Sequence, residues 1–137
     1  MNEQSFNFTA DFVASRLTQQ QLQAITPITL AYIGDAVFEL YVRSRLLLPA
    51  KRIHDYHTQV VSHVKAERQA QYIDVLVPHL NDAEKDILRR GRNATSGKQH
   101  RASAQHYQQS TGFEALLGFL FLSDRARLTQ LLSHLAI

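Results

Sequence analysis

The sequence predicts an all-α fold, because apolar residues recur at intervals of three and four along most of the chain and no stretch alternates strictly. Of the 137 residues, 45% are hydrophobic and 20% are charged, the balance of an ordinary globular domain. Five glycines and three prolines are too few for a chain dominated by linkers. We therefore expect residues 1–137 to form a single helical domain.

The first half of the chain is expected to hold several helices. An amphipathic segment covers about 9–24 and is expected to break near its middle. Thr26 and Pro27 then supply an N-cap and a proline at the first helical position. That helix is expected to reach about Leu48, before Pro49. The following stretch, about 52–80, is expected to divide near Ser62.

The second half opens with a capping-box spacing, from Asn81 to Glu84, that begins a short helix ending near Arg90 and Gly91. Residues 91–103 contain no aliphatic residue larger than alanine, so we expect an exposed loop. A long helix over about 104–122 and a last one over about 124–135 complete the chain.

Composition excludes several classes of protein. Without cysteine there is no disulfide framework, thiol nucleophile or thiolate metal site. The longest uncharged apolar run, 115–122, is far shorter than the roughly 20 residues of a membrane span. The N-terminus lacks the basic-then-apolar order of a signal peptide. We expect a cytoplasmic protein.

The positive charge is concentrated in one segment. The chain has a formal net charge of +3, yet residues 85–101 hold six basic side chains against the single acid Asp86. The other positions carry nine basic and eleven acidic residues. Such a cluster suits a polyanionic partner better than a neutral metabolite, although a solvated helix end would have the same composition.

Two otherwise apolar segments, 28–42 and 113–122, each contain acids. A carboxylate in such surroundings is costly unless it meets a cation, a metal or a hydrogen-bond donor. Asp35 and Glu114 are the strongest cases, and Gly34 and Gly118 permit close helix contact beside them. Two acids brought together from different helices would form a hard-oxygen site suited to Mg²⁺.

Glu39 lies four residues after Asp35 and therefore on the same helical face. It could join the two acids, but Arg43 follows at the same spacing and favours a surface ion pair instead.

At these positions the chain resembles a known family. Residues 32–37 (YIGDAV) resemble the signature helix of ribonuclease III, and 113–118 (FEALLG) resemble its second acidic motif. Residues 88–97, with Ser110 and Thr111, look like the compact branch of that family, Mini-ribonuclease III. The resemblance covers about residues 18–122, which we expect to be the core of a ribonuclease III-like endonuclease domain without a separate double-stranded-RNA-binding domain.

The resemblance implies an all-helical, dimeric endoribonuclease that cleaves double-stranded RNA and leaves 5′-phosphate ends. Asp35 and Glu114 would be catalytic and would bind Mg²⁺, for which Mn²⁺ could substitute, with Glu39 as a third candidate ligand. The compact branch matures the large-subunit ribosomal RNA precursor, and a ribosomal protein is a candidate further partner. Two acidic positions of the larger family are occupied here by Ala31 and Thr111, so the number of metals stays open.

A-form RNA is recognised through phosphates, 2′-hydroxyls and helix shape, which basic and amide side chains can contact. The candidate RNA-binding residues are Arg89, Arg90, Arg92, Asn93, Lys98 and Lys65. One of the three arginines is expected to pair with an acid or to cap a helix end instead.

Two other functions compete with the nuclease. One is a non-catalytic RNA-binding or ribosome-assembly protein on the same fold, although such a protein has no need of Asp35 and Glu114. The other is a His-Asp phosphohydrolase, indicated by His54 and Asp55. That family also needs a histidine well upstream, and His54 is the first histidine of this chain. We expect the histidines to be exposed or capping. Tyr32 and Tyr107 could reach the site by helical spacing, but aromatic residues on buried helix faces more often belong to the core.

Overall fold

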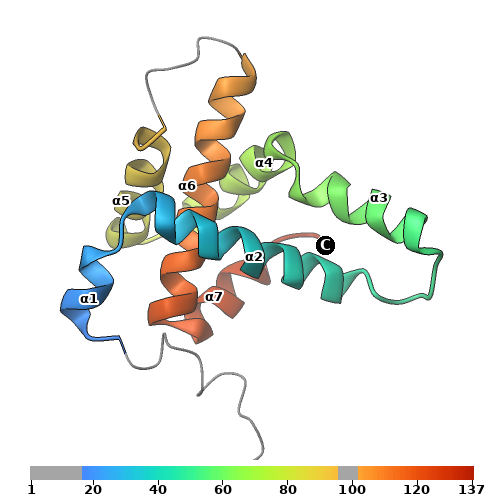
Figure 1. Cartoon of the computed structure of the whole chain (residues 1–137), viewed down its shortest axis with the longest axis horizontal. Coiled ribbons are helices and arrows are strands. Elements are labelled where there is room, and N and C mark those ends of the chain that lie inside the picture. Colours follow the sequence, from blue (N-terminus) through green and yellow to red (C-terminus); the bar gives the residue numbers. More distant parts are fainter. Residues whose placement is uncertain (1–16, 96–101) are drawn as a thin grey trace, which may run out of the picture.

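The computed structural model describes residues 17–95 and 102–137 (Figure 1). The described residues form helices joined by short connections and contain no strand, which confirms the all-α prediction. In chain order the elements are α1 (Gln19–Ala24), α2 (Pro27–Arg45), α3 (Ile53–Val64), α4 (Ala66–Leu76), the short 3₁₀ turn η2 (Val77–His79), α5 (Asp82–Asn93), α6 (Ala102–Ser123) and α7 (Arg125–Leu132).

Side-chain caps begin several of these helices. The Thr26 hydroxyl accepts from the amide of Thr29, and Pro27 occupies the first position of α2, as predicted. Asn81 and Glu84 form the predicted capping box at the start of α5, each side chain accepting from the other's backbone amide at 2.8 and 2.9 Å. These local signals fix where the helices begin.

Three predicted boundaries were wrong. α2 ends at Arg45, three residues before Leu48. The division of the 52–80 stretch falls at Lys65, whose extended backbone (φ −65°, ψ 152°) separates α3 from α4. α5 continues to Asn93, so the segment expected to be a loop from residue 91 begins as helix, and Gly91 is buried.

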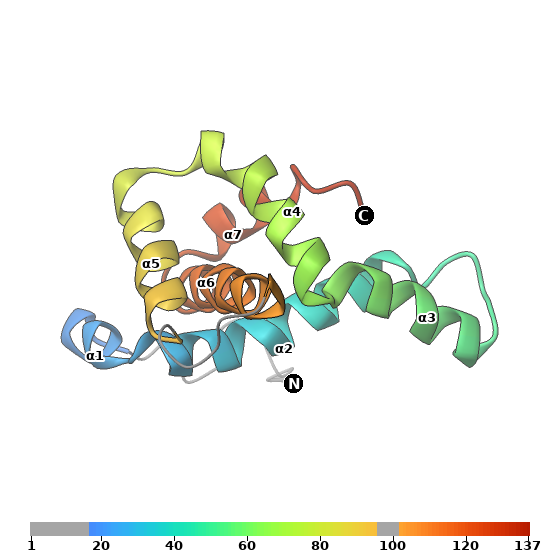
Figure 2. The same ribbon diagram turned by 90° about the horizontal axis from the view of Figure 1, so that it is seen from above.

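α6 is the central element of the fold. Seen from above, α2, α4, α5 and α7 surround it, while α3 extends away from the rest of the molecule (Figure 2). α6 packs most extensively against α2, and next against α5 and α4. This arrangement explains why nearly every residue from 110 to 120 is buried.

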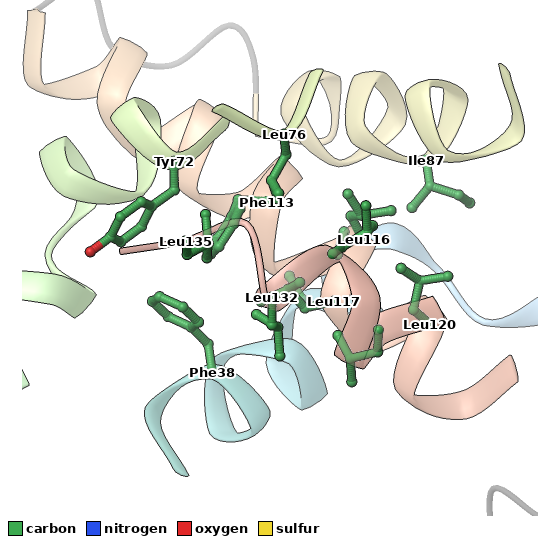
Figure 3. Packing of buried hydrophobic residues seen from close by; sticks show 14 of the residues in the cluster. Phe38, Tyr72, Leu76, Ile87, Phe113, Leu116, Leu117, Leu120, Leu132 and Leu135 are labelled. Atoms are coloured by element: carbon green, nitrogen blue, oxygen red, sulfur yellow. The ribbon is translucent and has the colours of Figure 1, made fainter. Parts of the chain in front are cut away.

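The core lies where α2, α4 and α6 meet (Figure 3). Phe38 packs edge-on against Phe113, with ring centroids 5.0 Å apart, and against Tyr72 at 6.0 Å. Leucines of α6 and α7 fill the remaining space, among them Leu116, Leu117, Leu131 and Leu132. The acidic residues of α2 and α6 are therefore mounted on the most tightly packed helices.

A buried ion pair joins α5 to α7. Glu84, which is only 2% exposed, accepts two hydrogen bonds from the Arg127 guanidinium at 2.8 and 2.9 Å. Arg127 also donates to the carbonyl of His79, so one side chain connects α7, η2 and the start of α5.

None of the described helices is long and apolar enough to span a bilayer.

Candidate active site

Glycines bring α2 and α6 into backbone contact beside the two predicted acids. A Cβ atom built on Gly34 would overlap the carbonyl oxygen of Glu114, and one built on Gly118 would overlap that of Leu30. Only glycine permits this approach. Because Asp35 follows Gly34 directly, the crossing brings the two acids together from separate helices, as the sequence predicts.

Glu114 is partly buried, and the Ser110 hydroxyl lies 2.9 Å from its Oε1. Burial raises the pKa of the Glu114 carboxyl to about 7, and the nearby Asp35 carboxylate also raises it. Hydrogen bonds from Ser110 and Gln69 act in the opposite direction. With a pKa of about 7, the Glu114 carboxyl is only partly ionised near neutral pH. The cause is its position in an apolar helix, close to a second acid.

Asp35 differs from the expectation of a buried acid, because its side chain is exposed. Partial burial and the neighbouring Glu39 carboxylate nevertheless raise the pKa of Asp35 above its ordinary value. Asp35 and Glu114 thus resist ionising side by side. A bound cation would relieve the repulsion, so this pair of oxygen donors fits a divalent metal ion.

Glu39 forms an ion pair with Arg43 at 2.6 Å, the contact its spacing favours. Across the described ranges, no three His, Cys, Asp or Glu side chains gather as one potential metal-binding group. Within the described residues, the candidate site therefore has two carboxylates, Asp35 and Glu114, while Glu39 is paired with Arg43.

The basic residues belong to α5, which packs against α6 next to α2. Gly91 packs against Gly112, where an added Cβ would come within 2.8 Å of the Gly112 Cα atom. Arg90 and Arg92 flank this contact and are exposed. Arg89 pairs with Asp86 at 2.6 Å, so one of the three arginines meets an acid, as expected.

Three further RNA-binding candidates differ in their placement. Asn93 is exposed at the end of α5. Lys65 is exposed at the α3–α4 junction, 3.9 Å from Glu67. Lys98 lies outside the described residues.

Two aromatic residues correct the sequence interpretation. Tyr32 is 80% exposed and Tyr107 is 57% exposed, so neither belongs to the core. His54 and His57 are exposed, as expected.

Sequence reasoning missed Gln69, which is 1% exposed and hydrogen-bonded to Ser110 at 2.7 Å. The spacing of four between Ser110 and Glu114 was the available signal for the serine. No comparable sequence signal marked Gln69, because it lies in a polar stretch of the chain.

Comparison with known proteins identifies the family of this chain. A family model described as the ribonuclease III domain matches residues 28–125. The chain is 51% identical over 112 residues to Mini-ribonuclease 3 of Synechocystis sp., covering 82% of this chain and 78% of that relative. It is 48% identical over 122 residues to Mini-ribonuclease 3 of Synechococcus sp., covering 89% and 88%.

A crystal structure of a Fusobacterium nucleatum protein superimposes with a TM-score of 0.72 at 22% identity, covering 82% of this chain and 92% of that one. That likeness supports the fold alone. The family match and the sequence relatives together show that this chain belongs to the ribonuclease III family, in its Mini-ribonuclease 3 branch.

Proposed function

We propose that this protein is a metal-dependent endoribonuclease that cleaves double-stranded RNA at the Asp35 and Glu114 pair. The observation that supports the proposal is the glycine-mediated crossing of α2 and α6, together with the raised pKa values of the two acids, one of which acts electrostatically on the other. Two perturbed acids in a family of nucleases are a candidate catalytic centre.

The proposed metal is Mg²⁺, or Mn²⁺ in its place, held by Asp35 and Glu114, with Glu39 as a further candidate if it leaves Arg43. Mg²⁺ bound there would stabilise negative charge on the scissile phosphate and lower the pKa of an attacking water. Glu114 offers an anchored carboxylate, because Ser110 contacts its Oε1. Asp35 offers an exposed one, open to an approaching phosphate.

The proposed RNA contacts lie within this same domain. Arg90 and Arg92 are exposed on the helix next to the acids, where they can pair with phosphates of a duplex. Arg89, Asn93, Lys65 and Lys98 remain further candidates. The resemblance to the compact branch supports a double-stranded segment of the large-subunit ribosomal RNA precursor as substrate, and a homodimer as the working form.

Incubation of long end-labelled double-stranded RNA with the purified chain, in Mg²⁺ and in chelator, tests the proposal. Discrete Mg²⁺-dependent cuts with 5′-phosphate ends are expected from the unmodified protein. Asp35→Asn and Glu114→Gln keep the size of each side chain but remove its charge, so each is expected to abolish cleavage.

Circular dichroism and RNA binding by the same variants serve as controls, and both are expected to be retained. RNA binding without cutting by the unmodified protein, in any divalent metal, would contradict the nuclease. That result would instead support a non-catalytic RNA-binding role.

A further inference from the structure

A buried chain of hydrogen bonds leads from the α3–α4 junction to Glu114. Gln69 of α4 donates from Nε2 to the carbonyl of Val64, the last residue of α3, at 2.9 Å. Its Oε1 lies 2.7 Å from the Ser110 hydroxyl, which in turn lies 2.9 Å from Glu114 Oε1. Gln69 and Ser110 are 1% and 7% exposed, so water does not readily replace these contacts.

The Gln69 amide can take only one orientation in this chain. The Val64 carbonyl is purely an acceptor, so the NH₂ group must face it, and Oε1 must then face Ser110. Gln69 therefore presents a fixed acceptor to the serine hydroxyl from a neighbouring helix.

Ser110 behaves unlike Thr111 and Ser123, which lie on the same helix. Within helices, serine and threonine commonly donate to the carbonyl four residues earlier. Thr111 does so to Tyr107, its neighbour in α6, and Ser123 does so to Phe119. Ser110 instead contacts Gln69 and Glu114, so the glutamine holds the serine hydroxyl in the rotamer that reaches the acid.

We propose that Gln69, together with Ser110, is a positioning residue for the metal site. By accepting the single hydroxyl hydrogen of Ser110, Gln69 holds the serine Oγ atom 2.9 Å from Glu114 Oε1 and so fixes the position of the Glu114 side chain. This inference rests on the proposed function, since it assumes that Glu114 binds the metal. Residues that orient metal ligands typically change metal affinity by about 10–100-fold when replaced.

The test measures the binding of Mn²⁺ to the full chain, in the absence of RNA, by electron paramagnetic resonance. Gln69→Met keeps the length of the side chain but removes both hydrogen bonds, and Ser110→Ala removes the hydroxyl. Each variant is expected to bind Mn²⁺ about tenfold more weakly. Because Gln69 and Ser110 belong to one network around Glu114, the double variant is expected to lose less affinity than the sum of the two single losses.

Tyr72→Phe is the matched control. Tyr72 is 4% exposed and lies on α4 one turn after Gln69, and its hydroxyl accepts from Arg68 at 3.2 Å and lies 2.5 Å from His63 Nδ1. The control therefore loses a buried hydrogen bond from the same helix without touching the chain to Glu114, and is expected to bind Mn²⁺ normally. Thermal unfolding of each variant separates lost stability from lost metal affinity.

Three results would overturn the inference: unchanged Mn²⁺ binding by Gln69→Met, equal weakening by Tyr72→Phe, or additive losses in the double variant. If the unmodified chain shows no Mn²⁺ binding that Asp35→Asn removes, the metal site itself fails and the inference fails with it. If the unmodified chain binds Mn²⁺ but leaves RNA uncut, the proposed function fails while the positioning role of Gln69 stands.

Discussion

At the scale of single residues, the surroundings of Glu114 oppose the ionisation of its carboxyl group. The side chain is partly buried in the most apolar helix, beside a second carboxylate. Ser110 offsets this only in part, because its single hydrogen is also within reach of Gln69. Such a group is poorly accommodated as an anion until a cation joins it.

The stability of the metal-free protein should therefore depend on pH through Glu114. Its pKa is raised from 4.5 to about 7 in the folded chain, so folding takes up a proton between these values. Stability is then fully retained below about pH 4.5 and falls as pH rises through 7. The loss is at most about 3 kcal/mol by linkage, and smaller because the carboxyl is partly exposed.

Denaturant unfolding from pH 5 to pH 8 in chelator measures this loss, and Glu114→Gln, which cannot ionise, is its control. The difference in unfolding free energy between the two proteins should move in favour of the variant as pH rises. Parallel curves for the two proteins would contradict the assignment of the raised pKa to Glu114.

At the scale of elements, the contact of α2 with α6 depends on glycine. At position 118 a methyl group would overlap the Leu30 carbonyl, which is backbone and cannot turn aside. Replacing an interior helical glycine with alanine ordinarily stabilises a helix by about 1 kcal/mol. Here we expect the overlap to prevail, since forced overpacking costs about 1–3 kcal/mol or more.

Gly118→Ala should thus lower both the unfolding free energy and the cleavage rate, because α2 carries Asp35 away as it shifts. Denaturant unfolding and cleavage assays measure the two effects. The exposed Ala126→Gly in α7 is the control, expected to cost only about 1 kcal/mol through helix propensity. A stabilised Gly118→Ala protein would refute the close crossing.

The exposed arginines of α5 lead to a separate prediction about the salt dependence of RNA binding. Each phosphate contact releases counterions, so Arg90→Ala and Arg92→Ala should each weaken RNA binding and reduce the slope of log affinity against log salt by about 1. Arg52→Ala is the matched control, because Arg52 is 93% exposed and precedes α3, the helix that extends away from the rest of the molecule (Figure 2). Fluorescence anisotropy with duplex RNA, in an Asp35→Asn background, measures the slopes. Unchanged slopes in both α5 variants would exclude this helix as the RNA contact.

Local signals in the sequence account for the helix starts but not for every end. Thr26 with Pro27, and Asn81 with Glu84, act within one turn of chain, so their effect could be predicted. The end of α5 could not, because Gly91 was interpreted as a stop. In the fold that glycine is a contact with Gly112, a residue 21 positions away. Such tertiary uses of glycine leave no local pattern.

The candidate site divides in the same way. Asp35 and Glu114 stand out in the sequence because acids are rare in apolar helices, and the structure brings them together. The exposure of Asp35 and of Tyr32 could not be predicted, because the apolar face of α2 continues onto the surface. Gln69 could not be predicted either, since its burial depends on where α4 crosses α6.

At the scale of the whole molecule, that exposed face of α2 is the feature most unlike an isolated domain. Ile28, Tyr32 and Leu40 are 48%, 80% and 55% exposed, and with Ala36 they form a row at spacing four along one side of the helix. A contiguous apolar row on the surface indicates an interaction site. The homodimer proposed above would cover it with a second copy of the chain.

Placing a charge in this row should therefore dissociate the dimer. Tyr32→Glu and Leu40→Glu each oblige the interface to bury an unpaired carboxylate, which is costly, so both should shift the protein from dimer to monomer. Sedimentation equilibrium over a range of concentrations measures the shift. Val75→Glu is the control, since Val75 is 44% exposed on α4, which covers a different side of α6 (Figure 2). If the unmodified chain sediments as a monomer throughout, or all three variants remain dimeric, α2 does not form the interface. Because Asp35 lies on this same helix, between Tyr32 and Leu40, a true interface along α2 would also bring the partner close to each acidic site.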